Sequence, residues 1–275
     1  MKLFFKQSVI CIVLFIILAD KTKSSPDIYY LNINPVPSIT GKTILFDCER
    51  KTNPALLAQA DSNYASIIYS PSVFNLAELS PAMIMIGNKI NDDLMAAVSI
   101  YNLGNSLYSD FSASLHSGLK ISSILDAGLS FTFDRLSISN YNNYSSFNIN
   151  LGFILKMSDI FNAGFNYAYL QNPYPDEIRS LFNHLINFGL GVTLNDEISF
   201  ELGSRILINY MTGFTFSGRY NIVDYLALKL GFSTNPEIVS FAVKITPVNY
   251  ISISAGLNYH SYLGFSKSFA LSFYW

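Results

Sequence analysis

The sequence has little charge and lacks long hydrophobic runs beyond one near its start. Charged residues make up 13% of the 275 residues, whereas ordinary soluble domains carry about 25%. Only Val9 to Ala19 forms a continuous apolar run, although half of the residues are hydrophobic. A membrane-spanning helix needs about 20 consecutive apolar residues. The sequence therefore argues against membrane helices, and its short dispersed apolar stretches, rich in Tyr and Phe, favour strands.

Cysteine is scarce, and motifs for catalysis or metal binding are lacking. Cys11 lies within the amino-terminal apolar run, which we expect to be removed with a leader, so one cysteine, Cys48, remains and no internal disulfide can form. The three histidines have unrelated spacings, whereas metal ligands are typically close in sequence. Neither Gly-x-Ser-x-Gly nor a phosphate-binding loop occurs. We expect no catalytic, cofactor or metal site, and hence no enzyme. The alternative is a lipase-like site near His260, assembled from Ser and His of different strands.

The amino terminus has the pattern of a secretory leader. Lys2 and Lys6 precede an apolar core that is too short to span a bilayer, and polar residues follow it. We treat residues 1–25 as a signal peptide, cut between Ala19 and Ser25; the alternative is an uncleaved anchor. Removing residues 1–24 takes away four lysines and one aspartate, so the formal charge moves from −2 to −5. This acidic balance gives no reason to expect nucleic acid binding.

From Ser62 to the end, large apolar residues alternate with small polar ones. In the last stretch Phe265, Phe269 and Phe273 share one face of a strand, and serines share the other. Successive side chains of a strand point to opposite faces. Large apolar residues suit contact with lipid, and small residues suit the interior of a closed barrel. A soluble β-sandwich also alternates, but its polar face usually carries Lys, Glu and Thr.

Counting these stretches predicts an all-β fold, a transmembrane antiparallel β-barrel of about 14 strands, the even number that bacterial barrels favour. We expect residues 62–275 to form this barrel. Tight turns, such as those at 91–92 and 195–196, alternate with longer loops, such as 70–81 and 171–181. The strands are expected at 62–70, 82–89, 93–101, 110–120, 123–136, 142–155, 158–170, 182–194, 197–207, 210–219, 223–232, 236–246, 249–260 and 265–275.

Residues 26–61 fall outside the alternating pattern, because prolines interrupt them. Within them only Thr43 to Phe46 reads as a strand. Asn53, Pro54 and Ala55 predict a turn into a short helix, since proline fits a first helical turn. We expect this segment to be an amino-terminal plug or periplasmic cap; a flexible tail is the alternative.

Short motifs add a family resemblance. Gly231 to Glu237 and Tyr259 to Phe273 resemble segments near the end of PorV/PorQ-type outer-membrane proteins, and Asn53-Pro54-Ala55 matches that group's amino-terminal Asn-Pro-Ala. The group is related to the long-chain fatty acid transporter (FadL-like) barrels, which carry an amino-terminal hatch. The resemblance implies that fold, and a role in type IX secretion or in the passage of hydrophobic molecules.

Three sets of residues are candidates for function. The closing strand resembles the signal read by the barrel-assembly machinery, or contributes to the aromatic girdle at the membrane interface; its residues are Phe269, Leu271, Phe273 and Trp275. The alternation of side chains along each strand places several ionisable residues on the inner face. They either line a pore or pair with one another within a packed interior. These residues are His116, Lys120, Asp134, Glu201, Arg205, Lys229, Lys244 and His260. Arg135 falls on the outer face by strict alternation; either it lies near a rim where its side chain reaches water, or a β-bulge resets the register. The loop at 172–177 either contacts a partner or lipopolysaccharide, or is simply a solvated loop.

Two functions remain open at this stage. The favoured one is a non-enzymatic accessory protein of the PorV/PorQ type, linked to secretion and exported to the outer membrane. The alternative is a FadL-like channel for small hydrophobic molecules. The expected partners are outer-membrane lipids and lipopolysaccharide, the barrel-assembly machinery, and either secretion proteins or a hydrophobic small molecule.

Overall fold

A computed structural model describes residues 36–74, 76, 78–105, 107–140, 143–170, 184–208 and 211–275. The expected signal peptide and the loop at 172–177 lie outside the described residues. No described helix is both long and apolar enough to cross a membrane.

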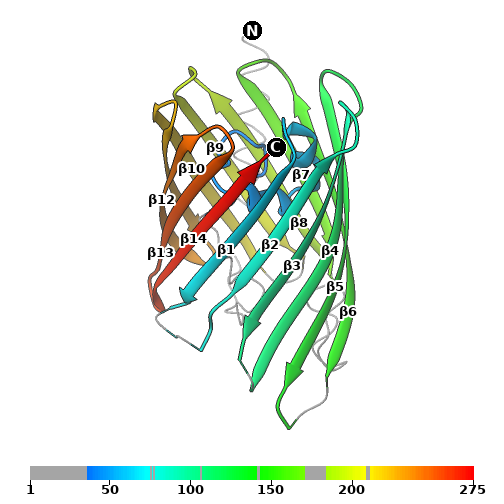
Figure 1. Cartoon of the computed structure of the whole chain (residues 1–275), viewed down its shortest axis with the longest axis vertical. Helices are drawn as coiled ribbons and strands as arrows, with labels where there is room; N and C mark the ends of the chain where they lie inside the picture. Colours follow the sequence, from blue (N-terminus) through cyan, green and yellow to red (C-terminus); the bar gives the residue numbers. More distant parts are fainter. Residues whose placement is uncertain are drawn as a thin grey trace.

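Fourteen antiparallel strands close into one barrel, in which each strand pairs with its neighbours in sequence and β1 pairs with β14 (Figure 1). The predicted fold class and strand number are confirmed. The strands are β1 (Tyr64–Ser72), β2 (Ala82–Lys89), β3 (Leu94–Gly104), β4 (Tyr108–Lys120), β5 (Leu125–Ile138), β6 (Tyr144–Lys156), β7 (Phe161–Tyr169), β8 (His184–Thr193), β9 (Ile198–Leu207), β10 (Met211–Val223), β11 (Leu226–Thr234), β12 (Glu237–Val248), β13 (Ile251–His260) and β14 (Gly264–Tyr274).

The alternation of the sequence becomes an apolar outer wall and a small, polar inner wall. Phe147 in β6, Leu230 in β11 and Phe269 in β14 are at least half exposed on the outside. Their neighbours along each strand, among them Ser146 and Ser268, are buried inside. A closed barrel also pairs every strand edge, which an apolar environment requires because it offers no hydrogen bonds.

The two ends of the barrel differ in their connections. At the end that carries the carboxy terminus, the upper rim in Figure 1, short connections join β2 to β3, β8 to β9 and β12 to β13. We call this end the tight-turn rim and the opposite end the long-loop rim. The opposite end is not uniformly long, since only Asn235 and Pro236 separate β11 from β12. Strands β10 and β12 extend beyond the expected ranges 210–219 and 236–246, to Val223 and Val248.

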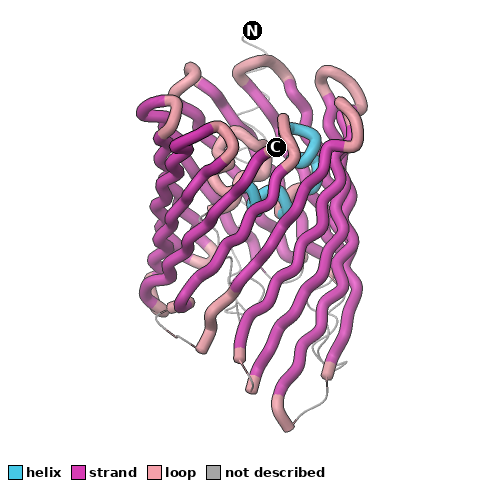
Figure 2. Tube along the Cα trace, viewed as in Figure 1, coloured by secondary structure: helices cyan, strands magenta, loops and turns pink. Residues whose placement is uncertain are grey.

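Residues 36–60 lie inside the barrel in its tight-turn half, where Figure 2 shows their two short helices in cyan. We call this segment the plug. It contains the 3-10 helices η2 (Asp47–Lys51) and η3 (Pro54–Gln59). Asn53 caps η3 by accepting a hydrogen bond from the Ala55 amide, so a helix does follow the Asn-Pro-Ala turn.

The predicted strand at Thr43 to Phe46 is wrong. The Leu45 and Phe46 amides, which a strand would pair with a neighbouring strand, both donate to the Glu49 carboxylate over 3.0 Å. A local side-chain acceptor therefore replaces the sheet ladder at this point.

Candidate functional site: the plugged lumen

The backbone of the plug lies directly on glycines of the barrel wall. Gly118, Gly128 and Gly152 are paired with one another across β4, β5 and β6. A Cβ atom at Gly118 would lie 2.6 Å from the Ala58 amide nitrogen, and Cβ atoms at Gly128 and Gly152 would overlap Pro54, Ala55 and Asn53. We call these three residues the glycine seat. Only residues without a side chain allow η3 to come this close to the wall.

Glu201 of β9 is the main wall residue that binds the first part of the plug. Its carboxylate, which is buried, accepts hydrogen bonds from the Ser38 and Thr40 hydroxyls over 2.6 and 2.7 Å. The Ile39 and Thr40 amides and, at 3.4 Å, the Thr43 hydroxyl also donate to it. A buried carboxylate is stable only when its oxygens are satisfied in this way. The plug thus supplies the solvation that Glu201 loses on burial.

A second buried carboxylate, Glu49, belongs to the plug and binds a residue of the barrel wall. It forms an ion pair of 2.6 Å with Lys229 of β11, and both side chains are fully buried. The Ser38, Leu45 and Phe46 amides each donate to the same carboxylate over 3.0 Å. Removing one partner of such a pair leaves an uncompensated buried charge. The pair therefore fixes the plug against β11.

Asp47 connects the plug to the last strand. Its Oδ2 atom accepts a 2.6 Å hydrogen bond from the Tyr274 hydroxyl, while the Lys244 and Arg50 side chains each approach the carboxylate to 3.9 Å. Burial alone would raise the pKa of Asp47, but Lys244, Arg50 and the Tyr274 hydrogen bond outweigh it and hold the pKa below its usual value. The carboxylate is therefore stabilised in its charged form.

The ionisable residues that the sequence places inside the barrel form two groups. One group contacts the plug, and the other forms hydrogen bonds within the barrel wall. Glu201, Lys229 and Lys244 contact the plug or its binding partners. His116 bonds Ser99 and Ser130, Asp134 accepts from Ser112 and Asn148, and Arg205 donates to Asn187. The ring nitrogen Nδ1 of His260 accepts from the Tyr262 and Leu263 amides. Lys120 lies at the end of β4, opposite Asp126 of β5 in the strand register, and the Asp126 carboxylate is bound by Lys156 and Gln59. The side-chain hydrogen bonds and ion pairs of these residues, Lys120 apart, favour a packed interior at their positions.

Other residues named from the sequence lie elsewhere. Arg135 is exposed on the outer face near the long-loop end of β5. Phe269, Phe273 and Trp275 are exposed on the outer wall, and their role in assembly stays a prediction. No group of three metal-ligating side chains occurs in the described part of the chain.

Sequence reasoning missed Asp47, Glu49 and Tyr274. Tyr274 could have been assigned inward, because it alternates with the outward residues Phe273 and Trp275. The two acidic residues carried no such signal, since residues 36–60 follow no strand period. Their roles depend on partners more than 150 residues away in the sequence.

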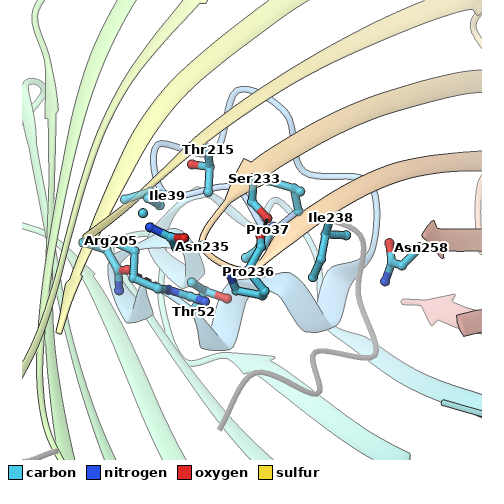
Figure 3. Close-up of a pocket in the computed structure, with 13 residues that line it drawn as sticks. Pro37, Ile39, Thr52, Arg205, Thr215, Ser233, Asn235, Pro236, Ile238 and Asn258 are labelled. Atoms are coloured by element: carbon cyan, nitrogen blue, oxygen red, sulfur yellow. Dashed lines mark hydrogen bonds between the residues drawn. The ribbon is translucent and has the colours of Figure 1, made fainter. Parts of the chain in front are cut away.

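A small pocket lies between the plug and the β11–β12 turn (Figure 3). Val36, Pro37 and Ile39 line its plug side, and Asn235 and Pro236 of the turn face it. Arg205 and several amide and hydroxyl side chains complete a mixed polar and apolar lining. Its volume is about 40 Å³, whereas an engineered apolar cavity that binds benzene measures about 150 Å³. In this conformation the pocket is too small for an aromatic ring.

No family model matches the sequence, and no curated protein is significantly similar to it in sequence. Solved structures with the same architecture are found. A Pseudomonas aeruginosa FadL homologue superposes with a TM-score of 0.59 at 11% identity, over 87% of this chain and 98% of that one. The fold is that of the FadL-like barrels.

Two further structures with this fold are described as a hydrocarbon channel and a toluene transporter. The CymD monoaromatic hydrocarbon channel gives a TM-score of 0.64 at 9% identity, over 89% of this chain and 98% of that one. The Pseudomonas putida toluene transporter TodX gives 0.58 at 10% identity, over 82% and 93%. None of these similarities supports the PorV/PorQ resemblance or the secretion role that the sequence analysis favoured. At such low identity, the FadL-like comparison establishes the fold only.

Proposed function

We propose that this protein is an outer-membrane channel for small hydrophobic molecules, with residues 36–60 as its plug and residues 1–25 as a cleaved export signal. The observation that carries the proposal is a closed barrel with an apolar outer wall whose lumen holds a plug bound through buried carboxylates. The fold, shared with proteins described as a monoaromatic hydrocarbon channel and a toluene transporter, supports the same function.

The pocket beside Val36 is the proposed position of a permeating molecule. It borders both the plug and the β11–β12 turn, so a small displacement of either would enlarge it. Because its present volume is well below that of a benzene site, the structure corresponds to a closed state under this proposal.

Uptake measurements test the channel directly. The full chain would be expressed in a Gram-negative host that lacks its own hydrophobic-substrate transporter, and uptake of radiolabelled toluene or oleate would be followed. We expect uptake above that of the host carrying an empty vector. A barrel of equal abundance that produces no uptake of either compound would contradict the proposal.

A plug-deleted chain, without residues 36–60, provides the matched comparison in liposomes. Deletion leaves Glu201 and Lys229 in a water-filled lumen, so we expect this form to admit small sugars that the full chain excludes. Equal exclusion of sugars by both forms would contradict a plug that closes the lumen. Co-purification of a secretion protein with the full chain, without uptake, would instead favour the accessory role.

A further inference from the structure

The pair formed by β1 and β14 differs from every other pair in the barrel. Successive strands are joined by a connection that helps to fix their register, but the two ends of the sheet are joined by none. A slip of one residue would turn each side chain to the wrong face, whereas a slip of two keeps the alternation intact. Such a slip changes the stagger and tilt of the barrel. Alternation alone therefore leaves the closing register undetermined.

The plug lies against the seam between these two strands. In the observed register Ile68 of β1 lies opposite Ala270 of β14. Both belong to one apolar cluster with Leu45 and Phe46 of the plug. The inner-face positions two residues away on β14 are serines, Ser268 and Ser272. A slip of two would press a serine hydroxyl against this apolar part of the plug, where burial of an unbonded hydroxyl is unfavourable.

A hydrogen bond between the plug and β14 is a second contact that exists only in the observed register. The Tyr274 hydroxyl donates to Asp47 of the plug over 2.6 Å and lies 3.1 Å from Lys244 Nζ. The Tyr274 ring also packs against a cluster that contains Leu57 of the plug and Tyr64 of β1. A slip of two residues would move Tyr274 by about 7 Å along the strand, which breaks the hydrogen bond to Asp47.

We infer that the plug selects the register in which the barrel closes. It is suited to this because only residues 61–63 separate it from β1, while its side chains bind β14. The plug thereby holds the first and last strands in one alignment. This role concerns assembly and does not depend on what passes through the lumen.

Cysteine pairs on the outer wall can report the register. Ile67 lies opposite Leu271 in the observed structure, and a slip of two would place it opposite Phe269 or Phe273. Three chains, I67C/L271C, I67C/F269C and I67C/F273C, would be refolded from urea into detergent micelles, oxidised, and analysed by mass spectrometry. Cys48 is fully buried, and burial, with Glu49 and Asp47 nearby, raises the pKa of its thiol, so it reacts poorly.

Each pair would be examined in four backgrounds: unchanged, D47N/Y274F, A270S/S272A, and Y250F. We expect the unchanged chain to yield the 67–271 disulfide. The D47N/Y274F background removes the hydrogen bond between Asp47 and Tyr274. It should raise the ratio of the slipped disulfides (67–269 and 67–273) to the native 67–271 disulfide at least about tenfold. The A270S/S272A exchange keeps the composition but moves the apolar position by two, and should favour the 67–273 product.

Y250F is the control for Y274F, because it removes the hydroxyl of an exposed tyrosine at the tight-turn rim. It should leave the ratio of slipped to native disulfide unchanged. A rise in slipped product in either plug-contact background, without a rise in Y250F, supports the inference. Native product alone in both backgrounds, or an equal rise in Y250F, overturns it.

Discussion

Buried carboxylates are the residues on which the position of the plug depends. Glu201 receives donors from Ser38, Ile39, Thr40 and Thr43, so one wall residue organises most of the first part of the plug. The alternation of side chains along the strand was enough to predict that Glu201 points inward. It could not identify the donors, because they come from a segment without periodic structure.

Replacing Glu201 with Gln should destabilise the folded protein by about 2–3 kcal/mol. The amide removes the charge and turns one acceptor into a donor that faces the donors of the plug. Thermal unfolding in detergent, followed by the heat-dependent shift in gel mobility, measures the loss. Glu197→Gln, at an exposed position of the β8–β9 turn, is the control. Equal midpoints for the two variants would contradict this role of Glu201.

Asp47 should make the stability of the protein depend on pH. Its folded pKa lies below the usual value of 3.8, so the unfolded chain takes up a proton first as the pH falls. The stabilisation from its charge is therefore present above about pH 4 and is lost as the pH falls through the folded pKa. Asp47→Asn should cost about 1 kcal/mol at pH 7, and the difference from the unchanged protein should shrink at pH 3.

Unfolding midpoints at the two pH values test this dependence. Asp196→Asn, in an exposed turn, serves as the matched control and should show no difference at either pH. A deficit for Asp47→Asn that is as large at pH 3 as at pH 7 would show that the charge is not responsible.

Among the elements, the strands were the most predictable and the plug the least. The expected and observed strands agree to within a few residues, because the period of two is repeated in each of them. The helix η3 was anticipated from Asn53 and Pro54. Its position against β4, β5 and β6 was not, since glycines in a strand have several possible causes.

The close contact between η3 and the glycine seat predicts the effect of adding a side chain there. Gly128→Ala adds a methyl group where the backbone of Pro54 and Ala55 lies, and such overpacking costs about 1–3 kcal/mol. We expect η3 to be displaced and small sugars to enter liposomes faster than with the unchanged chain. Gly218→Ala is the matched control, because its nearest neighbours are Phe200 and Ser199 rather than the plug. Equal permeability for both variants would contradict the seat.

Taken as a whole, the molecule presents apolar side chains around its entire wall. Phe147, Leu230 and Phe269 lie on three well-separated strands and are 65%, 61% and 53% exposed. Soluble monomers rarely expose apolar patches beyond a few hundred Å². We therefore expect the protein without residues 1–25 to require detergent and to aggregate when detergent is removed. A monodisperse monomer in detergent-free sedimentation would contradict a lipid-facing wall.

The sequence by itself determined the class of the protein. Alternating large and small side chains specify strands, their number, and which face of each turns outward, because these properties follow from local backbone geometry. Only the tertiary structure decided how Glu49 meets Lys229, how Tyr274 meets Asp47, and how little space remains beside Val36. These contacts join residues far apart in the chain, and closure of the barrel around the plug brings them together.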